Sequence, residues 1–423
     1  MSTVTTQAVP RLVPLIAGWV IFVSSGVLAG LEFLVSGIAS FLLLPSYAFI
    51  LATLFLRWKS AFLLIFHAPL IVAFIILCYF SYLWSGDPGT TLNEATRLLI
   101  HFLTAVCVVS WIGVKRGLDL TFSVLTIGCL LSILSALRPE LSYGLYGDFR
   151  GMYQQKNILG FAASMAALYG AYGLIFGRPF IPSLIGLAAG LTVTLMTDSA
   201  TSIVIFAVGC GTMLVQRSIS GRKGMRLSKQ VGLLVLLIFA GYIGNLLADT
   251  IISALGRDPT LTGRVALWDE GERLTALRPL FGYGYQILAN DTGPMALYMI
   301  QRIGDFALQF HNSLLNIRFQ LGIPGLVMNI AIIGYVFVIS LREAYRGDPT
   351  KIVPLVTALG ISLVLQSVSE STFGAPRSLQ MFLLFLVLCI PGESRRSISP
   401  NGKPPRVSGD NKPMSGKREG EAV

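Results

Sequence analysis

Long apolar runs, separated by short polar stretches, make up most of this chain. Runs of roughly 18 or more apolar residues are long enough to cross the hydrocarbon core of a bilayer. The runs are continuous rather than alternating, which favours helices over the strands of a barrel. We therefore predict an all-α polytopic helical membrane protein with about 12 transmembrane helices, near residues 12–29, 37–56, 61–83, 98–114, 119–137, 157–176, 179–197, 201–216, 230–248, 321–341, 352–369 and 378–391.

Composition supports this class. The 423 residues are 54% hydrophobic and 13% charged, with a mean hydropathy of +0.71, whereas a soluble domain carries about 25% charged residues. The first apolar run lacks a small-residue cleavage site, so we interpret it as a span and not as a signal peptide. The five cysteines lie within apolar runs and without the spacing of metal ligands, which is typical of small buried side chains.

The net charge of +11 would suit a nucleic-acid partner, but its distribution argues against one. Most Lys and Arg residues fall in alternate loops and in the last segment, as expected for loops that stay in the cytoplasm. Both termini are then predicted to be cytoplasmic. We expect residues 1–391 to form the transmembrane domain, with an outer loop at about 249–320 inserted in it, and residues 392–423 to form a disordered basic cytoplasmic tail.

The outer loop is the largest polar segment, and its pattern predicts two amphipathic helices. Apolar and charged positions recur at helical spacing from Arg264 to Leu277 and again from Met295 to Phe310. Both helices could lie on the membrane surface or cap a cavity beneath them. Gly282 and Gly284 between them allow a tight turn.

One of the three histidines is a candidate for catalysis. His67 and His101 lie within predicted spans, where we expect them to be packing or hydrogen-bonded residues. His311 stands where the polar loop meets a span, next to Asn312. An imidazole there could accept a proton from a sugar hydroxyl, or could simply cap the following helix. The residues alone leave both interpretations open.

Three cations are candidates for binding phosphate. The planar guanidinium of Arg264 suits phosphate oxygens, although Arg264 could instead pair with Asp269 or Glu270. Arg150 and Lys156 could hold a diphosphate, or could anchor the chain at the interface by snorkelling. No metal-ligand cluster or phosphate-binding glycine loop is present in the sequence, so no metal and no cofactor is expected.

Four outward segments together resemble the O-antigen ligase and polymerase superfamily of bacterial envelope glycan assembly. The resemblance spans roughly residues 75–340 and rests on Trp84-Ser85-x-Asp87-Pro88, Arg150-Gly151 to Lys156-Asn157 with Leu159-Gly160, Thr262-Gly263-Arg264 with Trp268 and Pro279-x-x-Gly282-x-Gly284, and His311-Asn312-Ser313-x-Leu315 with Gly322-Ile323-Pro324-Gly325-Leu326. Each segment is weakly specific alone, and their order outside the membrane makes the set specific.

The resemblance implies inverting, metal-independent transfer of a glycan from an undecaprenyl-diphosphate carrier to an acceptor hydroxyl at the periplasmic face of the bacterial inner membrane. It implies that Arg264 grips the diphosphate and that His311 serves the acceptor. The remaining candidates for substrate binding are Arg150, Lys156, Asn157, Arg302 and Asn312. The chain departs from the family at Ala200, where a basic residue is common, and Arg150, Lys156 or Arg302 could supply the missing charge.

The acceptor determines which reaction takes place. Gln155-Lys156-Asn157 resembles exopolysaccharide polymerases more than ligases. A polymerase would use a carrier-linked glycan as acceptor, and a ligase would use lipid A-core. Flippase and chain-length regulator proteins are further candidate partners. A lipid-linked oligosaccharide flippase is the rival function, although the sequence lacks the internal repeats of many transporters.

Overall fold

The computed structural model describes residues 12–25, 27, 38–144, 147–218, 226–235, 264–304, 308–347 and 351–396. Within these ranges the chain is helical and has no strand, apart from one isolated bridge between Tyr143 and Phe149. The all-α class is therefore confirmed for the described part. The first residues of the predicted disordered tail 392–423, residues 392–396, are helical in this structure, and the rest of that tail lies outside the described part. Residues 236–248 of the predicted span 230–248 and the loop residues 249–263 also lie outside it.

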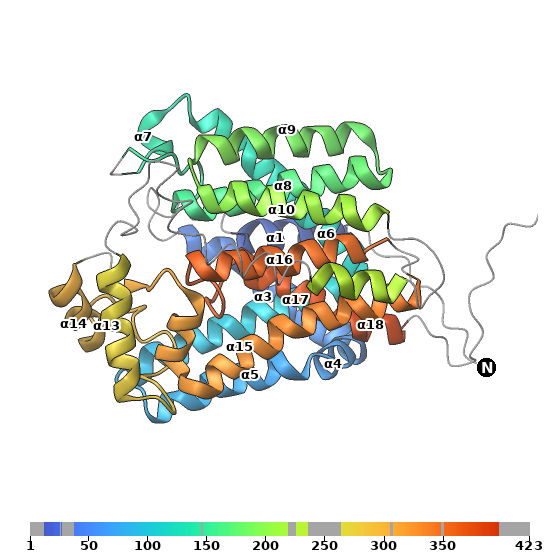
Figure 1. Ribbon diagram of the computed structural model, residues 1–423. Coiled ribbons are helices and arrows are strands. Elements are labelled where there is room, and N and C mark those ends of the chain that lie inside the picture. Colours follow the sequence, from blue (N-terminus) through green and yellow to red (C-terminus); the bar gives the residue numbers. More distant parts are fainter. Residues whose placement is uncertain are drawn as a thin grey trace, which may run out of the picture.

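The helices of the first half of the chain pack among those of the second half, as Figure 1 shows. They are α1 (Leu12–Ser24), α3 (Ile38–Leu56), α4 (Trp58–Phe66), α5 (Pro69–Phe80), α6 (Pro88–Ser135), α7 (Pro139–Ser142), α8 (Lys156–Phe176), α9 (Phe180–Met196) and α10 (Ala200–Arg217). Those of the second half are α13 (Arg264–Leu277), α14 (Pro294–Ile303), α15 (Ser313–Arg346), α16 (Val353–Ser369), α17 (Leu379–Leu388) and α18 (Ile390–Arg396). Helix positions follow most of the predicted apolar runs, but the predicted span 61–83 is divided between α4 and α5.

Glycines at positive φ break the two longest helices. Gly113 (φ 81°) interrupts α6, and a Cβ on Gly117 would lie 3.4 Å from the side chain of Val108. Nine residues of straight helix would span about 13 Å, so the chain reverses at Gly113, and the two arms of α6 correspond to the predicted spans 98–114 and 119–137. Gly322 (φ 63°) likewise breaks α15 between a short first arm and a long second arm.

The number of spans is not confirmed. Among the described residues, four helices are long and apolar enough to cross a membrane, namely α6, α8, α10 and α15. A fifth span results if the bent pair α3 and α4 is counted as one. The other apolar helices, α9 and α16 among them, are 10–17 residues long. The prediction of about 12 spans therefore remains a prediction.

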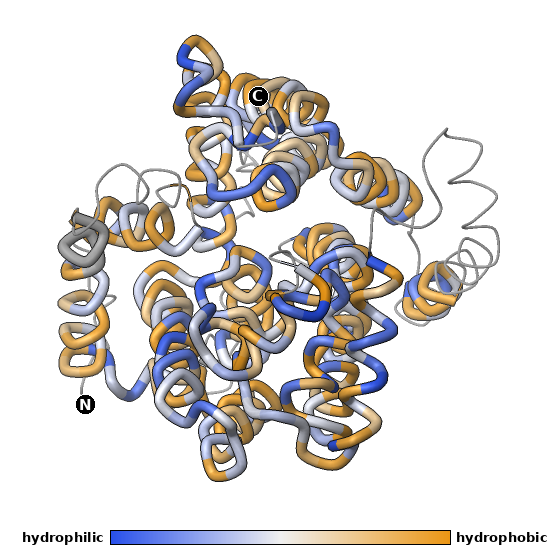
Figure 2. Tube along the Cα trace, turned by 90° about the vertical axis from the view of Figure 1, so that its left-hand side faces the viewer, coloured by the Kyte–Doolittle hydropathy of each residue, from blue (hydrophilic) through white to orange (hydrophobic). Residues whose placement is uncertain are grey.

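The main core consists of apolar side chains between these helices, and small residues bring some of them very close. A Cβ at Gly170 or Gly190 would lie within 2.6 Å of backbone atoms across the contact of α8 and α9. Such close approach is typical of helix pairs in membranes. Figure 2 views the molecule from the side of α13 and α14, where hydrophilic segments lie among predominantly hydrophobic helices. The polar loop therefore forms one end of the molecule.

The histidines and cysteines of the core have the structural roles predicted. His67 Nδ1 lies 2.8 Å from the Leu63 carbonyl, and His101 Nε2 lies 3.1 Å from that of Ser378. All five cysteines are free, and four of them are buried.

Candidate functional site

The outer loop has its own small hydrophobic core. Helix α13 begins and ends where the sequence predicts, and buries Leu267 and Leu274. These side chains form a cluster with Met299 of α14, Phe310 and Phe319. Gly271 provides the room, because a Cβ there would lie 2.6 Å from the ring of Phe310. The loop is thus a folded cap over the first arm of α15.

The second amphipathic helix is shorter than predicted. Helix α14 ends at Ile303, because Gly304 adopts φ 118° and leaves the helical conformation. Phe310, which the periodicity placed on this helix, lies outside it and packs edge-on against Phe319. Its carbonyl accepts a hydrogen bond from Trp268 Nε1 at 2.7 Å. Phe310, which was predicted to lie on the apolar face of a helix, therefore connects α13 to α15.

The break in α15 is the docking point for the turn between α13 and α14. Tyr283 and Gly284 donate backbone hydrogen bonds to the carbonyls of Phe319 and Gln320 at 3.0 and 2.9 Å. A Cβ on Gly282 would lie 2.4 Å from the Phe319 carbonyl oxygen, and one on Gly322 would lie 2.2 Å from that of Leu280. Gly282 and Gly322 are therefore both needed, because the two backbone segments touch here and leave no room for a side chain.

The segment around Asp87 locks this turn from the other side. Trp84 Nε1 donates to the Phe281 carbonyl at 2.8 Å, and Thr91 Oγ1 donates to the Tyr285 carbonyl at 3.0 Å. Asp87 caps α6 and accepts from Asn290 Nδ2 at 2.9 Å. The bond from Asn290 and the two from Thr90 lower the pKa of Asp87 below its ordinary value. This carboxylate is therefore fully used in holding the cap.

The centre of the candidate site is a contact between His311 and Glu370. His311 Nδ1 lies 2.9 Å from Glu370 Oε2. The two residues are 59 positions apart, and their side chains are 18% and 8% exposed. A carboxylate that accepts from Nδ1–H fixes the tautomer of a histidine and leaves Nε2 as a hydrogen-bond acceptor. This arrangement is suited to removing a proton from a hydroxyl.

Two further side chains converge on the same carboxylate. Asn157 Nδ2 donates to Glu370 Oε1 at 2.7 Å. Arg264 Nη2 lies 3.6 Å from Glu370 Oε1, and its Nη1 donates to the Ser369 carbonyl at 3.0 Å. A buried carboxylate needs such partners in place of the water that burial removes. The site thus joins the starts of α8 and α13, the entry to α15 and the end of α16.

Backbone geometry sets the position of His311. Its φ of 50° is in the left-handed region, and Asn312 then caps α15 by accepting from the amides of Leu314 and Leu315. Ser313 Oγ donates to the Glu370 carbonyl at 2.7 Å and accepts from the Phe373 amide at 3.1 Å. A positive φ at a non-glycine residue is characteristic of functional sites. Asn312, predicted to bind substrate, has a capping role in this structure.

The remaining predicted cations lie in two places. Lys156 is the first residue of α8 and directly precedes Asn157. Arg150 lies in the loop before α8, where its amide donates to the Ser142 carbonyl. Arg302 lies in the cap, with its Nε 3.9 Å from Glu270.

Glu270 organises the outer face of the cap. It accepts hydrogen bonds from Arg273 and Tyr298 at 2.6 Å. The bond from Arg273 is the main cause that lowers the pKa of Glu270 to about 2, against burial, which raises it. Glu270 therefore pairs with Arg273 and Arg302 and not with Arg264.

The start of α10 carries the departure from the family. Ala200 is its first residue and is exposed. Gly160, one turn into α8, packs against the start of α10, because a Cβ on it would lie 2.5 Å from Ser202 Oγ and 3.1 Å from Ser199 Cβ. Position 200 is therefore close to the first turn of α8, where Lys156 stands. No group of three or more His, Cys, Asp or Glu residues that could hold a metal ion occurs in the described ranges.

The fold and site define a helical, membrane-type protein with a polar cap over a histidine, carboxylate and arginine cluster. Residues 185–330 match a family model described as O-Antigen ligase. The matched part of this chain includes Arg264, Arg302 and His311. The chain is also 26% identical over 351 residues to the exopolysaccharide production protein ExoQ of Rhizobium meliloti (strain 1021), covering 77% of this chain and 78% of that protein. Both matches confirm the resemblance to the O-antigen ligase and polymerase superfamily.

Glu370 is the site residue that the sequence reasoning missed. It falls in the short polar segment 370–377, between two apolar runs. An acid at the end of an apolar run needs a cation or hydrogen-bond donors nearby. That signal was present in the sequence, but the partners could be identified only from the packing of α16 against α15.

Proposed function

We propose that this protein assembles bacterial cell-envelope polysaccharide by transferring a glycan from an undecaprenyl-diphosphate carrier to an acceptor sugar hydroxyl, with inversion at the anomeric carbon. The observation that carries the proposal is the bond from His311 to the buried carboxylate of Glu370. It provides a general base outside the predicted spans, in a chain that resembles glycan ligases and polymerases.

In the proposed reaction, His311 Nε2 accepts the proton of the acceptor hydroxyl. The hydroxyl oxygen then forms a bond to the anomeric carbon of the donor, and the bond from that carbon to the diphosphate oxygen breaks. The diphosphate leaves with the electron pair, still attached to its lipid. Glu370 stabilises the imidazolium that forms, as a carboxylate does in other histidine-based sites.

Arg264 is proposed to hold the donor diphosphate. Its guanidinium is 26% exposed and bonded on one side to the Ser369 carbonyl, so part of its fork remains open to a substrate. A diphosphate is a good leaving group when fixed cations match its charge. Lys156 or Arg150 at the start of α8, or Arg302 of the cap, would supply the second cation in place of the residue missing at position 200. No metal takes part in this scheme.

Repeat-unit polymerisation is the favoured reaction. ExoQ of Rhizobium meliloti is named for exopolysaccharide production, and the segment before α8 resembles polymerases. Ligation to lipid A-core is the alternative, because the family match is described as O-Antigen ligase and the donor chemistry is the same.

Transfer by the purified protein in detergent tests the proposal. Labelled undecaprenyl-diphosphate oligosaccharide is offered with a carrier-linked glycan, with lipid A-core, or with neither. We expect the carrier-linked glycan to lengthen, and transfer to lipid A-core instead would assign a ligase. Absence of transfer to either acceptor, together with movement of the labelled donor across vesicles, would replace the enzyme by a flippase.

A further inference from the structure

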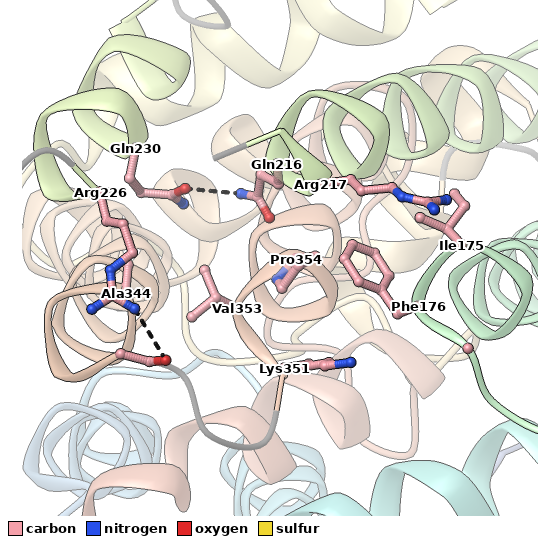
Figure 3. Close-up of a pocket in the computed structure, with 12 residues that line it drawn as sticks. Ile175, Phe176, Gln216, Arg217, Arg226, Gln230, Ala344, Lys351, Val353 and Pro354 are labelled. Atoms are coloured by element: carbon pink, nitrogen blue, oxygen red, sulfur yellow. Dashed lines mark hydrogen bonds between the residues drawn. The ribbon is translucent and has the colours of Figure 1, made fainter. Parts of the chain in front are cut away.

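A cavity of about 530 Å³ lies at the opposite end of α16 from Glu370. Figure 3 shows the side chains around it. It is bounded by the last residues of α8, α10 and α15, by the first residues of α16 and by part of the helical segment 226–235. Helix α16 has 17 residues, and a helix of that length spans about 25 Å. The cavity is therefore separate from the His311 site.

The charge of this cavity is one-sided. Three of the lining residues, Arg217, Arg226 and Lys351, are cations, and no acid is among the described residues that line it. Val353 and Pro354 belong to the first turn of α16, and the N-terminus of a helix carries partial positive charge. Lys351 has φ 54°, and its carbonyl accepts a hydrogen bond from Tyr172 at 2.7 Å. That conformation is unfavourable for lysine, so α8 fixes this backbone at the edge of the cavity.

A buried polar network forms the wall between the cations. Gln230 Nε2 donates to Ser340 and Thr357 at 2.9 and 3.0 Å, and Gln230 Oε1 accepts from Gln216 at 3.1 Å. Gln216 and Gln230 are only 6% and 1% exposed. Among the described residues, Gln216 Oε1 has no hydrogen-bond partner, and neither has Arg226 Nε. Orphan buried groups of this kind are costly to leave unpaired, and a ligand bound in the cavity could satisfy both.

The two orphan groups call for a ligand with both an acceptor and a donor. A phosphate oxygen could accept from Arg226, and a hydroxyl beside it could donate to Gln216 Oε1. Ile175 and Phe176 add an apolar side to the cavity. Basic pockets between helix ends are typical binding sites of phospholipid headgroups.

We propose that this cavity binds the phosphodiester headgroup of an anionic phospholipid that carries a hydroxyl group, at the end of the helices opposite to the cap. Free inorganic phosphate shares the anionic part of this chemistry and lacks the apolar part. The volume is within the usual range for small-ligand sites, about 300–1,000 Å³.

The test measures ligand binding to the full-length protein in detergent by thermal unfolding and by native mass spectrometry. The probes are phosphatidylglycerol, phosphatidylcholine and inorganic phosphate. The test variant is Arg217→Gln with Lys351→Gln, and both side chains are exposed. Its matched control is Lys115→Gln with Arg116→Gln, which removes the same charge from exposed positions that do not line the cavity.

We expect phosphatidylglycerol to raise the unfolding temperature of the natural protein and of the control, and to bind the test variant about 10- to 30-fold more weakly. Equal stabilisation by inorganic phosphate would support the phosphate site and assign free phosphate as its source. Equal binding of phosphatidylglycerol to the natural protein and the test variant would overturn the proposal, as would a preference for phosphatidylcholine. Should the double variant not fold, Arg217→Gln alone gives the same comparison.

Discussion

Glu370 and Lys351 stand at opposite ends of α16, and their surroundings differ in charge. At the Glu370 end, one buried carboxylate is shared by His311, Arg264 and Asn157, so positive and negative groups meet within the protein. At the Lys351 end, the described residues that line the cavity include three cations and no acid. A balanced cluster fixes the geometry of a proton transfer, whereas an unbalanced one attracts an anion from outside.

The largest expected effect is the loss of activity when the negative charge of Glu370 is removed. Glu370→Gln keeps the shape of the side chain but takes away the negative charge that orients and stabilises protonated His311. We expect the kcat of glycan transfer to fall by roughly 100-fold or more, with a smaller change in KM, measured with labelled donor in detergent. The control is Glu272→Gln, whose side chain is 55% exposed and bonded to Arg318 away from the site. A loss of equal size in the control would remove Glu370 from the mechanism.

The second prediction concerns the cations around the donor. Arg264→Ala should reduce activity by roughly 10- to 100-fold, because the diphosphate loses a charged partner. At least one of Arg150→Ala, Lys156→Ala and Arg302→Ala should also reduce it, by about tenfold, if that residue replaces the cation missing at Ala200. Steady-state kinetics of the four variants make the comparison. Full activity in all three, with loss only in Arg264→Ala, would contradict the replacement.

The third prediction tests whether the cap holds the Glu370 end together. Gly322→Ala places a Cβ 2.2 Å from the Leu280 carbonyl oxygen at φ 63°, and should destabilise the protein by about 2 kcal/mol or more. Gly147→Ala is the matched control, since Gly147 also has a positive φ but no described atom within 4 Å of its Cβ position. It should cost about 1 kcal/mol. Thermal unfolding in detergent compares the two, and equal costs would mean that the close contact contributes nothing.

The smallest effect is a pH dependence of the cap. The hydrogen bond from Arg273 lowers the pKa of Glu270 from 4.5 to about 2. The ionised carboxylate therefore stabilises the folded cap above about pH 4.5, and this contribution is lost as the pH falls from 4.5 towards 2. Limited proteolysis between pH 3 and 7 should show loosening of the cap at the acidic end in the natural protein. Glu270→Gln should lack this change, because it has no group to titrate there.

Part of the site could be predicted from local sequence. His311 and Arg264 stand at helix boundaries in the loop, where polarity, a glycine turn and helical periodicity are all visible along the chain. The structure brings these two residues to one carboxylate, and their roles in transfer remain predictions. Asn312 caps α15 as its residue type favours. The predicted length of α14 was wrong. The helical periodicity of the sequence continues past Gly304, but the backbone leaves the helical conformation at that residue.

The sequence by itself determined the apolar helices, the polar loop and the bounds of α13, since these depend on composition and periodicity within a few turns. Only the tertiary structure decided that Glu370 is the partner of His311, that the turn after α13 docks at the break in α15, and that three cations line one cavity. Contacts of this kind join residues far apart in the chain. The hydrogen bond between Gln286 and Gln320 spans 34 positions, and that between Asp87 and Asn290 spans 203. Helix periodicity shows which face is buried, but which helices meet depends on how side chains across the whole chain pack together.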